Sequence, residues 1–285
     1  MSATADIVST EDGAELWHAS SGDGQPVILC HGGPGLWDNF DSLAALIEDF
    51  AEVHRWDQRG GGRSSRIGPY TVARMVADME VVRRHAGVES WVVAGNSWGA
   101  ELALHYAVAH PGRTRGLVYM SGRGLMDSWR DSNKAACSER EARRRTQAQR
   151  DRLDELSRIE PRSPGQEREF RLLSWFTDVS PGFDAEALLR DDLDAPYEIN
   201  YEANRALGDD NRSAAQDLRA ALPHLSVPTL LIHGSNDPRP ADGAQEIGRL
   251  MPHATVELID AGHMTWLEAP DTVRRLLRGF LRTVS

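Results

Sequence analysis

The sequence of 285 residues predicts an α/β protein in which helices cover both faces of a mostly parallel sheet. Short apolar runs typical of buried strands alternate with segments whose apolar residues recur at helical spacing. This alternation stops at about residue 124 and resumes at about residue 223. We therefore expect a core formed by residues 1–123 and 223–285, with residues 124–222 inserted as a helical cap.

The first part of the core is expected to contain strands at residues 7–8, 15–19, 27–30, 51–56, 91–94 and 116–120. Helices are expected at residues 39–50, 71–85 and 100–108. The cap has helical composition over residues 138–158, 167–175 and 197–207, and we find no strand signal there. A strand and turn over residues 228–234, and another over residues 256–262, return the chain to the α/β pattern. In such sheets ligands bind at the carboxyl ends of the strands.

The segment Gly95-Asn96-Ser97-Trp98-Gly99 carries the strongest chemical signal. It has the pattern Gly-x-Ser-x-Gly and lies between the expected strand at 91–94 and the expected helix at 100–108. A strand, this pattern and a helix in succession are typical of a tight turn that exposes a serine nucleophile. Serine is a weak nucleophile unless a base and an oxyanion site are presented to it.

Two further residues follow Ser97 in the order that this chemistry needs, Asp237 and then His263. Each comes after an apolar run and a polar turn, so both are expected at strand ends. A histidine can accept the serine proton because its pKa lies near neutrality, and a carboxylate orients the imidazole. The alternative is that Asp237 only caps a turn and His263 is an ordinary loop histidine. If Asp237 is not the orienting carboxylate, Asp260 is the next candidate.

The segment His31-Gly32-Gly33-Pro34-Gly35 directly follows the expected strand at 27–30. Glycines allow the backbone to approach a reacting centre and to aim N–H groups at it. We assign the oxyanion hole to the backbone N–H groups of Gly33 and of Trp98, the residue after the nucleophile. The alternative is an ordinary turn of glycine and proline.

Three motifs together resemble the prolyl aminopeptidase (proline iminopeptidase) branch of the α/β-hydrolase fold. They are HGGPG at residues 31–35, DQRGGGRS at residues 57–64 and GNSWGAELAL at residues 95–104. The resemblance covers the catalytic core, about residues 25–120 and 225–283.

The resemblance implies a Ser-His-Asp hydrolase with a helical cap, in which Ser97, Asp237 and His263 form the triad and an acyl-enzyme is formed. It implies cleavage of an amide or ester bond, with aminopeptidase-like action on N-terminal residues or small amides. An esterase, lactonase or thioesterase that acts on a small molecule is the alternative, followed by a non-catalytic ligand-binding protein.

Members of this family that act as aminopeptidases hold the free amine of the substrate with carboxylates of the cap. The nearest matches here are residues 175–178 and 197–202. Glu198 and Glu202 are spaced i, i+4, so a helix would present both carboxylates on one face; a solvent-facing pair beside Arg205 is the alternative. The expected substrate-binding residues are Trp37, Trp175, Asp178, Glu198, Tyr201 and Glu202.

The composition narrows the choice of partners. A net charge of −11 argues against nucleic acid and against an anionic membrane surface. Two cysteines give no disulfide framework, and no clustered ligand motif indicates a metal or a cofactor. The polar N-terminus lacks the apolar stretch of a signal peptide, and no apolar run approaches the length of a membrane helix. We therefore expect a cytoplasmic enzyme whose partner is a small molecule or a short peptide.

Overall fold

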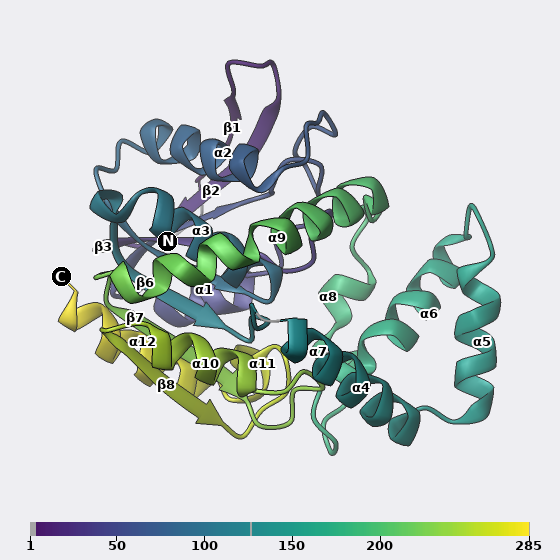
Figure 1. Cartoon of the computed structure of the whole chain (residues 1–285). Helices are drawn as coiled ribbons and strands as arrows, with labels where there is room; N and C mark the ends of the chain where they lie inside the picture. The colour runs from purple at the N-terminus through teal and green to yellow at the C-terminus, as the bar shows by residue number, and fades with distance from the viewer. Residues whose placement is uncertain (1–3, 126, 285) are drawn as a thin grey trace.

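A computed structural model describes residues 4–125 and 127–284 and places eight strands in one sheet of order β1-β2-β4-β3-β5-β6-β7-β8 (Figure 1). The strands are β1 (Thr4–Ser9), β2 (Glu15–Ser21), β3 (Gln25–Cys30), β4 (Ala51–Trp56), β5 (Trp91–Asn96), β6 (Thr114–Met120), β7 (Thr229–Gly234) and β8 (Ala254–Ile259). β2 is antiparallel to β1 and to β4, whereas all pairings from β4 to β8 are parallel. The predicted α/β class with a mostly parallel sheet is confirmed.

Helices cover both faces of the sheet, because each central strand is apolar on both sides. In β3, Ile28 and Cys30 belong to one buried cluster, and Val27 and Leu29 belong to the other. The first cluster includes side chains of α2 (Val72–His85), α3 (Trp98–Ala109), α9 (Tyr201–Ala221) and α10 (Asp242–Leu250). The second includes side chains of α1 (Asp41–Ile47), α11 (Thr265–Glu268) and α12 (Pro270–Thr283). The sheet is therefore the middle layer of three.

The chain between β6 and β7 is helical wherever it has regular structure in the described residues. Its helices are α4 (Asp127–Arg144), α5 (Gln147–Ser157), α6 (Pro164–Trp175), the 3₁₀ turn η2 (Phe176–Asp178), α7 (Ala185–Leu188), α8 (Arg190–Leu193), α9 and the 3₁₀ turn η3 (Leu222–His224). One further 3₁₀ turn, η1 (Pro111–Arg113), precedes β6. α5 and α6 project from the sheet, whereas α9 returns along it (Figure 1). Below, the segment between β6 and β7 is called the helical insertion. Its treatment as a separate unit bounded at residues 124 and 222 stays a prediction.

The helices of the insertion differ from the prediction in their bounds. The stretch expected at residues 138–158 is divided between α4, which begins at Asp127, and α5, and the helix expected at residues 167–175 begins at Pro164. The expected helix at residues 197–207 begins at Tyr201, because Asn200 has extended backbone and its side chain accepts a hydrogen bond from the N–H of Ala203. This is an N-cap, which fixes where a helix begins. The N–H of Asn200 also donates to the carbonyl oxygen of Gly35 at 2.9 Å. Residues 197–200 are therefore held outside the helix.

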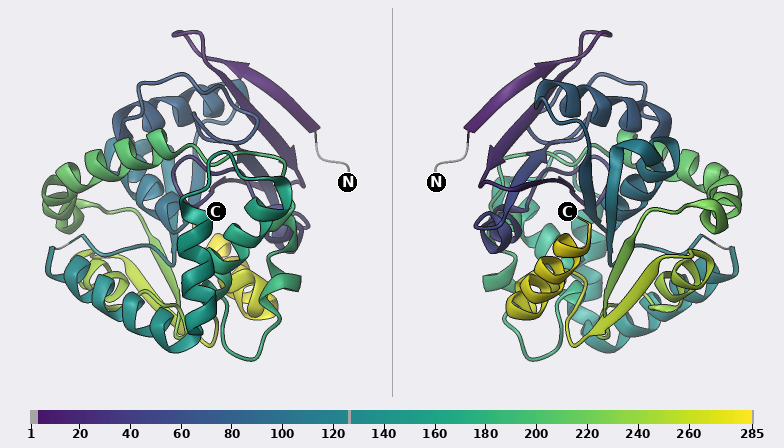
Figure 2. Two further views of the ribbon diagram at one scale, coloured as in Figure 1. Left: turned by 90° about the vertical axis from the view of Figure 1, so that its right-hand side faces the viewer. Right: turned by 90° about the vertical axis from the view of Figure 1, so that its left-hand side faces the viewer.

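The two edges of the sheet differ. The β1–β2 hairpin extends beyond the neighbouring elements at one edge, and β8 forms the other (Figure 2).

In the part of the chain that the structure describes, no helix combines the length and the apolar character needed to cross a membrane.

Candidate active site

The turn between β5 and α3 places Ser97 at the carboxyl end of a central strand. Ser97 has φ 56° and ψ −122°, a conformation uncommon for a residue with a side chain. The flanking glycines make this turn possible. A Cβ atom on Gly95 would lie 2.1 Å from the carbonyl oxygen of Gly99, and one on Gly99 would lie 1.9 Å from that of Cys30. The pattern Gly-x-Ser-x-Gly is thus a steric requirement of this turn.

Asp237 and His263 lie in the turns that follow β7 and β8, and their side chains contact each other. His263 Nδ1 donates to Asp237 Oδ2 at 2.6 Å, and both side chains are buried. This bond fixes the tautomer of His263 and leaves Nε2 free to exchange a proton. Asp260 is exposed and accepts a hydrogen bond from Asn236 instead, so the geometry favours Asp237 as the orienting carboxylate.

Asp237 is held as a carboxylate by its neighbours. Its second oxygen, Oδ1, accepts from the backbone N–H of Arg239 at 2.8 Å and lies 3.4 Å from Arg239 Nη1. Burial opposes ionisation, but the charges of His263 and Arg239 hold the pKa of Asp237 well below its usual range. The group that faces His263 is therefore negatively charged near neutral pH.

The loop after β3 runs beside the nucleophile. A Cβ atom on Gly32 would lie 3.2 Å from Cβ of Ser97, and Gly33 has φ +50°, which favours glycine. Trp98 is the first residue of α3, so its N–H has no partner in the preceding turn of the helix. Gly33, Ser97 and Trp98 line one cavity together. The two assigned oxyanion donors therefore lie near the nucleophile.

Gln58 connects this loop to the nucleophile turn, and the sequence analysis did not single it out. Its side chain accepts from Trp98 Nε1 at 2.8 Å and donates to the carbonyl oxygen of His31 at 2.8 Å. Its backbone N–H donates to His31 Nε2 at 3.1 Å, and Gln58 is 1% exposed. Gln58 belongs to the DQRGGGRS motif at residues 57–64, which is the signal in the sequence that could have identified it. Gln58 therefore ties the loop after β3 to the side chain of Trp98.

A cavity of about 160 Å³ opens in front of Ser97 and His263. Two predicted substrate-binding residues, Trp37 and Trp175, wall it with their rings 6.3 Å apart in an edge-to-face arrangement. A third, Asp178, also lines it. The walls are completed by the two glycines of the loop after β3, by apolar and amide side chains, by the guanidinium of Arg239 and by one carboxylate outside the prediction, namely Gly32, Gly33, Leu36, Asn39, Asn96, Leu189, Met264, Arg239 and Asp192.

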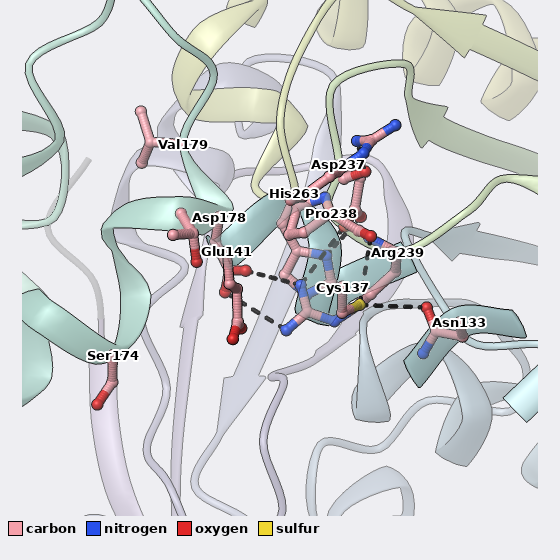
Figure 3. Close-up of polar contacts among 12 residues, drawn as sticks. Asn133, Cys137, Glu141, Ser174, Asp178, Val179, Asp237, Pro238, Arg239 and His263 are labelled. Carbon is pink, nitrogen blue, oxygen red and sulfur yellow. Dashed lines mark hydrogen bonds and ion pairs between the residues drawn. The ribbon is translucent and has the colours of Figure 1, made fainter. Parts of the chain in front are cut away.

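The carboxylate of Asp178 is already paired. The carboxylate accepts a hydrogen bond from Arg239 Nη1 at 2.8 Å (Figure 3). The backbone oxygen of Asp178 accepts one from the N–H of His263, also at 2.8 Å. The side chain of Arg239 is 26% exposed, and it lies between Asp178 and Asp237. Asp178 therefore helps to hold His263 and Arg239 in place, and its charge is already paired with that of Arg239.

Asp192 has a different environment. Asn39 Nδ2 donates to its Oδ2 at 3.1 Å, and Arg171 Nη1 donates to its backbone oxygen at 3.2 Å, but among the described residues no cationic side chain forms an ion pair with its carboxylate. Burial is the main cause that raises the pKa of Asp192 to about 6. Its position in the short helix α8 gave no periodic signal, so the sequence analysis missed it.

The structure does not bring Glu198, Tyr201 and Glu202 to this cavity. Glu198 is exposed and its Oε2 lies 3.5 Å from Arg66 Nη1. The Tyr201 hydroxyl accepts from Arg162 at 3.3 Å, and Glu202 is exposed in the first turn of α9. Because α9 begins after Asn200, Glu198 and Glu202 do not share a helix face. Of the three predicted carboxylates only Asp178 lines this cavity, together with Asp192, which was not predicted.

Comparisons with known proteins agree with this geometry. The family model described as alpha/beta hydrolase fold matches residues 25–270. The proline iminopeptidase of Neisseria gonorrhoeae is 42% identical over 109 residues, which are 36% of this chain and 34% of that protein. The matched part thus spans about a third of the length of this curated relative.

Two solved structures are similar over almost the whole chain. A thermophilic esterase from Thermogutta terrifontis gives a TM-score of 0.73 at 24% identity and covers 100% of this chain and 99% of that chain. The proline iminopeptidase of Mycobacterium smegmatis gives a TM-score of 0.70 at 21% identity, covering 99% and 98%. At these identities the similarity establishes the fold.

Proposed function

Since the chain belongs to the alpha/beta hydrolase fold family, we propose that it is a serine hydrolase that cleaves a small amide or ester through an acyl-enzyme. The observation that carries the proposal is the hydrogen bond of 2.6 Å between His263 and Asp237, with His263 and Ser97 lining one cavity. Removal of any one of these side chains would break the relay.

In the proposed reaction Ser97 Oγ attacks the carbonyl carbon of the substrate while His263 Nε2 accepts the hydroxyl proton. The backbone N–H groups of Gly33 and Trp98 stabilise the oxyanion. Collapse of the intermediate breaks the bond to the leaving group, which takes the proton from His263. Water then attacks the acyl-enzyme with His263 again as the base, the bond between the acyl group and Ser97 Oγ breaks, and His263 returns the proton to Oγ. Asp237 remains ionised throughout, which is consistent with its lowered pKa.

We further propose that the substrate carries a free amine, as an aminopeptidase-like enzyme requires. Asp192 supports this, because it lines the cavity and among the described residues no cationic side chain forms an ion pair with its carboxylate, since Arg171 donates to its backbone oxygen instead. An ammonium group that enters an apolar cavity needs such a counter-charge. The aromatic walls formed by Trp37 and Trp175 would add a cation–π contribution.

An esterase, lactonase or thioesterase is the second candidate. The apolar walls of the cavity, which include Leu36, Leu189 and Met264, suit a neutral acyl group as well. In either case the helical insertion would act as a cap, since Trp175, Asp178, Leu189 and Asp192 all belong to it.

We also propose that the enzyme acts in the cytoplasm on a small molecule or a short peptide and without nucleic acid. Free Cys30 and Cys137 are compatible with a reducing compartment, and the cavity of about 160 Å³ suits a group of limited size.

The first experiment tests the nucleophile. A fluorophosphonate probe should label the wild-type chain at Ser97 and leave Ser97→Ala unlabelled. The same substitution should lower kcat by about 10⁶-fold while the circular dichroism spectrum stays unchanged. An unlabelled wild-type chain would favour a ligand-binding protein without catalytic activity.

A second experiment separates the two substrate classes. An aminoacyl-amide with a free amine and its N-acetylated form are compared at equal concentration. Faster cleavage of the free amine supports the aminopeptidase-like proposal. Equal or faster cleavage of the acetylated compound refutes it and favours the esterase alternative.

A further inference from the structure

A second cluster of ligating side chains lies at the β1 edge of the sheet, at the opposite edge from β8. Asp6 belongs to β1, His18 to β2, and His85 is the last residue of α2. His18 Nδ1 lies 3.1 Å from Asp6 Oδ1, and His85 Nε2 lies 2.7 Å from Asp6 Oδ2. One ligating atom from each residue can be chosen so that all three lie within 4.8 Å of one another. We propose that Asp6, His18 and His85 bind a divalent transition-metal ion such as Zn²⁺.

The environment of His18 supports a metal-binding role. His18 Nε2 lies 3.1 Å from Nδ1 of His54, and both imidazoles are buried. The other nitrogen of His54, Nε2, is buried and has no hydrogen-bond partner among the described residues. The carboxylate oxygen Oε1 of Glu52 is 3.5 Å from it, at the limit of a hydrogen bond. A line of polar groups thus runs from Asp6 through two histidines to Glu52.

Without a metal this line leaves one nitrogen unsatisfied. A neutral imidazole carries one proton, on one of its two ring nitrogens. His18 Nδ1 must then donate to Asp6, because two acceptors would otherwise face each other. His18 Nε2 accepts from His54 Nδ1, which leaves His54 Nε2 as a bare acceptor opposite an acceptor oxygen of Glu52. A buried polar atom without a partner is destabilising.

A metal ion bound at His18 Nδ1 would change the tautomers of both His18 and His54. The lone pair of His18 Nδ1 binds the ion, and its proton is released to solvent. The proton of His54 Nδ1 moves to His18 Nε2, so that His18 becomes the donor and His54 the acceptor of the same hydrogen bond. His54 gains a proton from solvent at Nε2, which now points a donor at Glu52, so the number of protons is unchanged. A metal-binding histidine whose other N–H is held by a neighbouring acceptor is the arrangement usual in such sites.

The ligand set selects the class of ion. Two imidazole nitrogens and one carboxylate suit Zn²⁺ and its neighbours, whereas Mg²⁺ and Ca²⁺ prefer oxygen alone. Asp6 and His85 are 44% and 38% exposed, so an ion can enter from solvent and a water molecule can complete its coordination. Because the ligands come from β1, β2 and α2, the ion would fasten the edge hairpin to the helix beside it (Figure 1).

The test uses the full chain without a histidine tag, treated with chelator and dialysed. Calorimetric titration with Zn²⁺ should give one saturable site per chain, and Tm should rise by roughly 5 °C at a 100-fold excess over Kd. Asp6→Asn and His85→Gln should each weaken Zn²⁺ binding on the order of 100-fold or more. The matched control His253→Gln alters an exposed histidine outside the cluster and should bind as the wild type does.

Two results would overturn the proposal. One is the absence of saturable Zn²⁺ binding in the micromolar range, and the other is equal binding by wild type, Asp6→Asn and His85→Gln. NMR of ¹⁵N-labelled histidines tests the tautomers directly. The ring proton of His18 should be on Nδ1 without zinc and on Nε2 with zinc, and an unchanged tautomer contradicts the inference. Hydrolysis rates at the distant Ser97 should be the same in the variants, which shows that they are folded.

Discussion

Asp192→Asn should make the protein more stable and, at the same time, less able to recognise an amine. The pKa of Asp192 is raised from 3.8 to about 6, mainly by burial. A carboxyl group whose pKa is raised in the folded state binds its proton more tightly there than in the unfolded chain. Stability therefore falls as the pH rises from about 4 to about 6, and the full loss is present above that range.

The size of the effect follows from the same values. A difference of about 2 pH units corresponds to about 3 kcal/mol, because one unit is worth about 1.4 kcal/mol. Asp192 is only partly buried, so solvent screening lowers the expected gain to about 1–2 kcal/mol. Asparagine has nearly the same shape and retains an oxygen that can accept from Asn39 Nδ2.

Denaturant unfolding at pH 8 and at pH 4 measures this gain. The variant should be more stable than the wild type at pH 8, and the difference should shrink at pH 4. Its kcat/KM for the aminoacyl-amide should fall about 10- to 100-fold, since a charged hydrogen bond is worth about 1.5–3 kcal/mol, while the N-acetylated substrate is unaffected. A variant that is no more stable at pH 8, or that keeps its preference for the free amine, would refute the reasoning.

Three other substitutions, two of which have a matched control, test how the site is built. Gly99→Ala should destabilise the fold by about 3 kcal/mol or more in denaturant unfolding, because the added Cβ would lie 1.9 Å from a backbone oxygen of β3. Gly279→Ala, in an open position of α12, is the control and should be neutral or stabilising by up to about 1 kcal/mol. Gln58→Leu should lower kcat about 10- to 100-fold without unfolding the protein, since the loop after β3 loses its tie to Trp98; an unchanged kcat would contradict its role. Asp237→Asn should lower kcat by about 10⁴-fold, whereas Asp260→Asn should leave it within twofold; the reverse order would exchange their roles.

The sequence predicted the elements of the core well because their signals are local. β5 is buried at every position, so the apolar run before Gly95 could only be a central strand. The requirement for glycine at Gly95 and Gly99 is also local, since it arises within one turn. The start of α9 was missed for the opposite reason. It depends on Asn200, which is held by Gly35 and Gly60, residues far away in the sequence.

The same distinction explains which parts of the site could be predicted. Ser97, Asp237 and His263 follow the parallel strands β5, β7 and β8, whose carboxyl ends all lie on the same side of the sheet. The topology alone therefore predicts that these residues lie near one another. The position of Asp192 beside Asn39 depends on how the insertion folds over the core, and no spacing in the sequence encodes it. The prediction that carboxylates of the insertion face the substrate chose Glu198 and Glu202 because of a helical spacing. The chain does not have that spacing, since α9 begins only at Tyr201.

The contacts of the insertion indicate that it does more than cover the cavity. The backbone oxygen of Asp178 accepts from His263, and its carboxylate pairs with Arg239, which also contacts Asp237. The carboxylate of Glu268 in α11 accepts from the backbone N–H groups of Gly262 and of Ser180 in the insertion, each at 2.9 Å. The loop that carries the base is thus held by the insertion as well as by β8. A substrate that displaces the insertion would therefore displace the proposed base, so substrate fit and catalytic alignment in this protein depend on the same contacts.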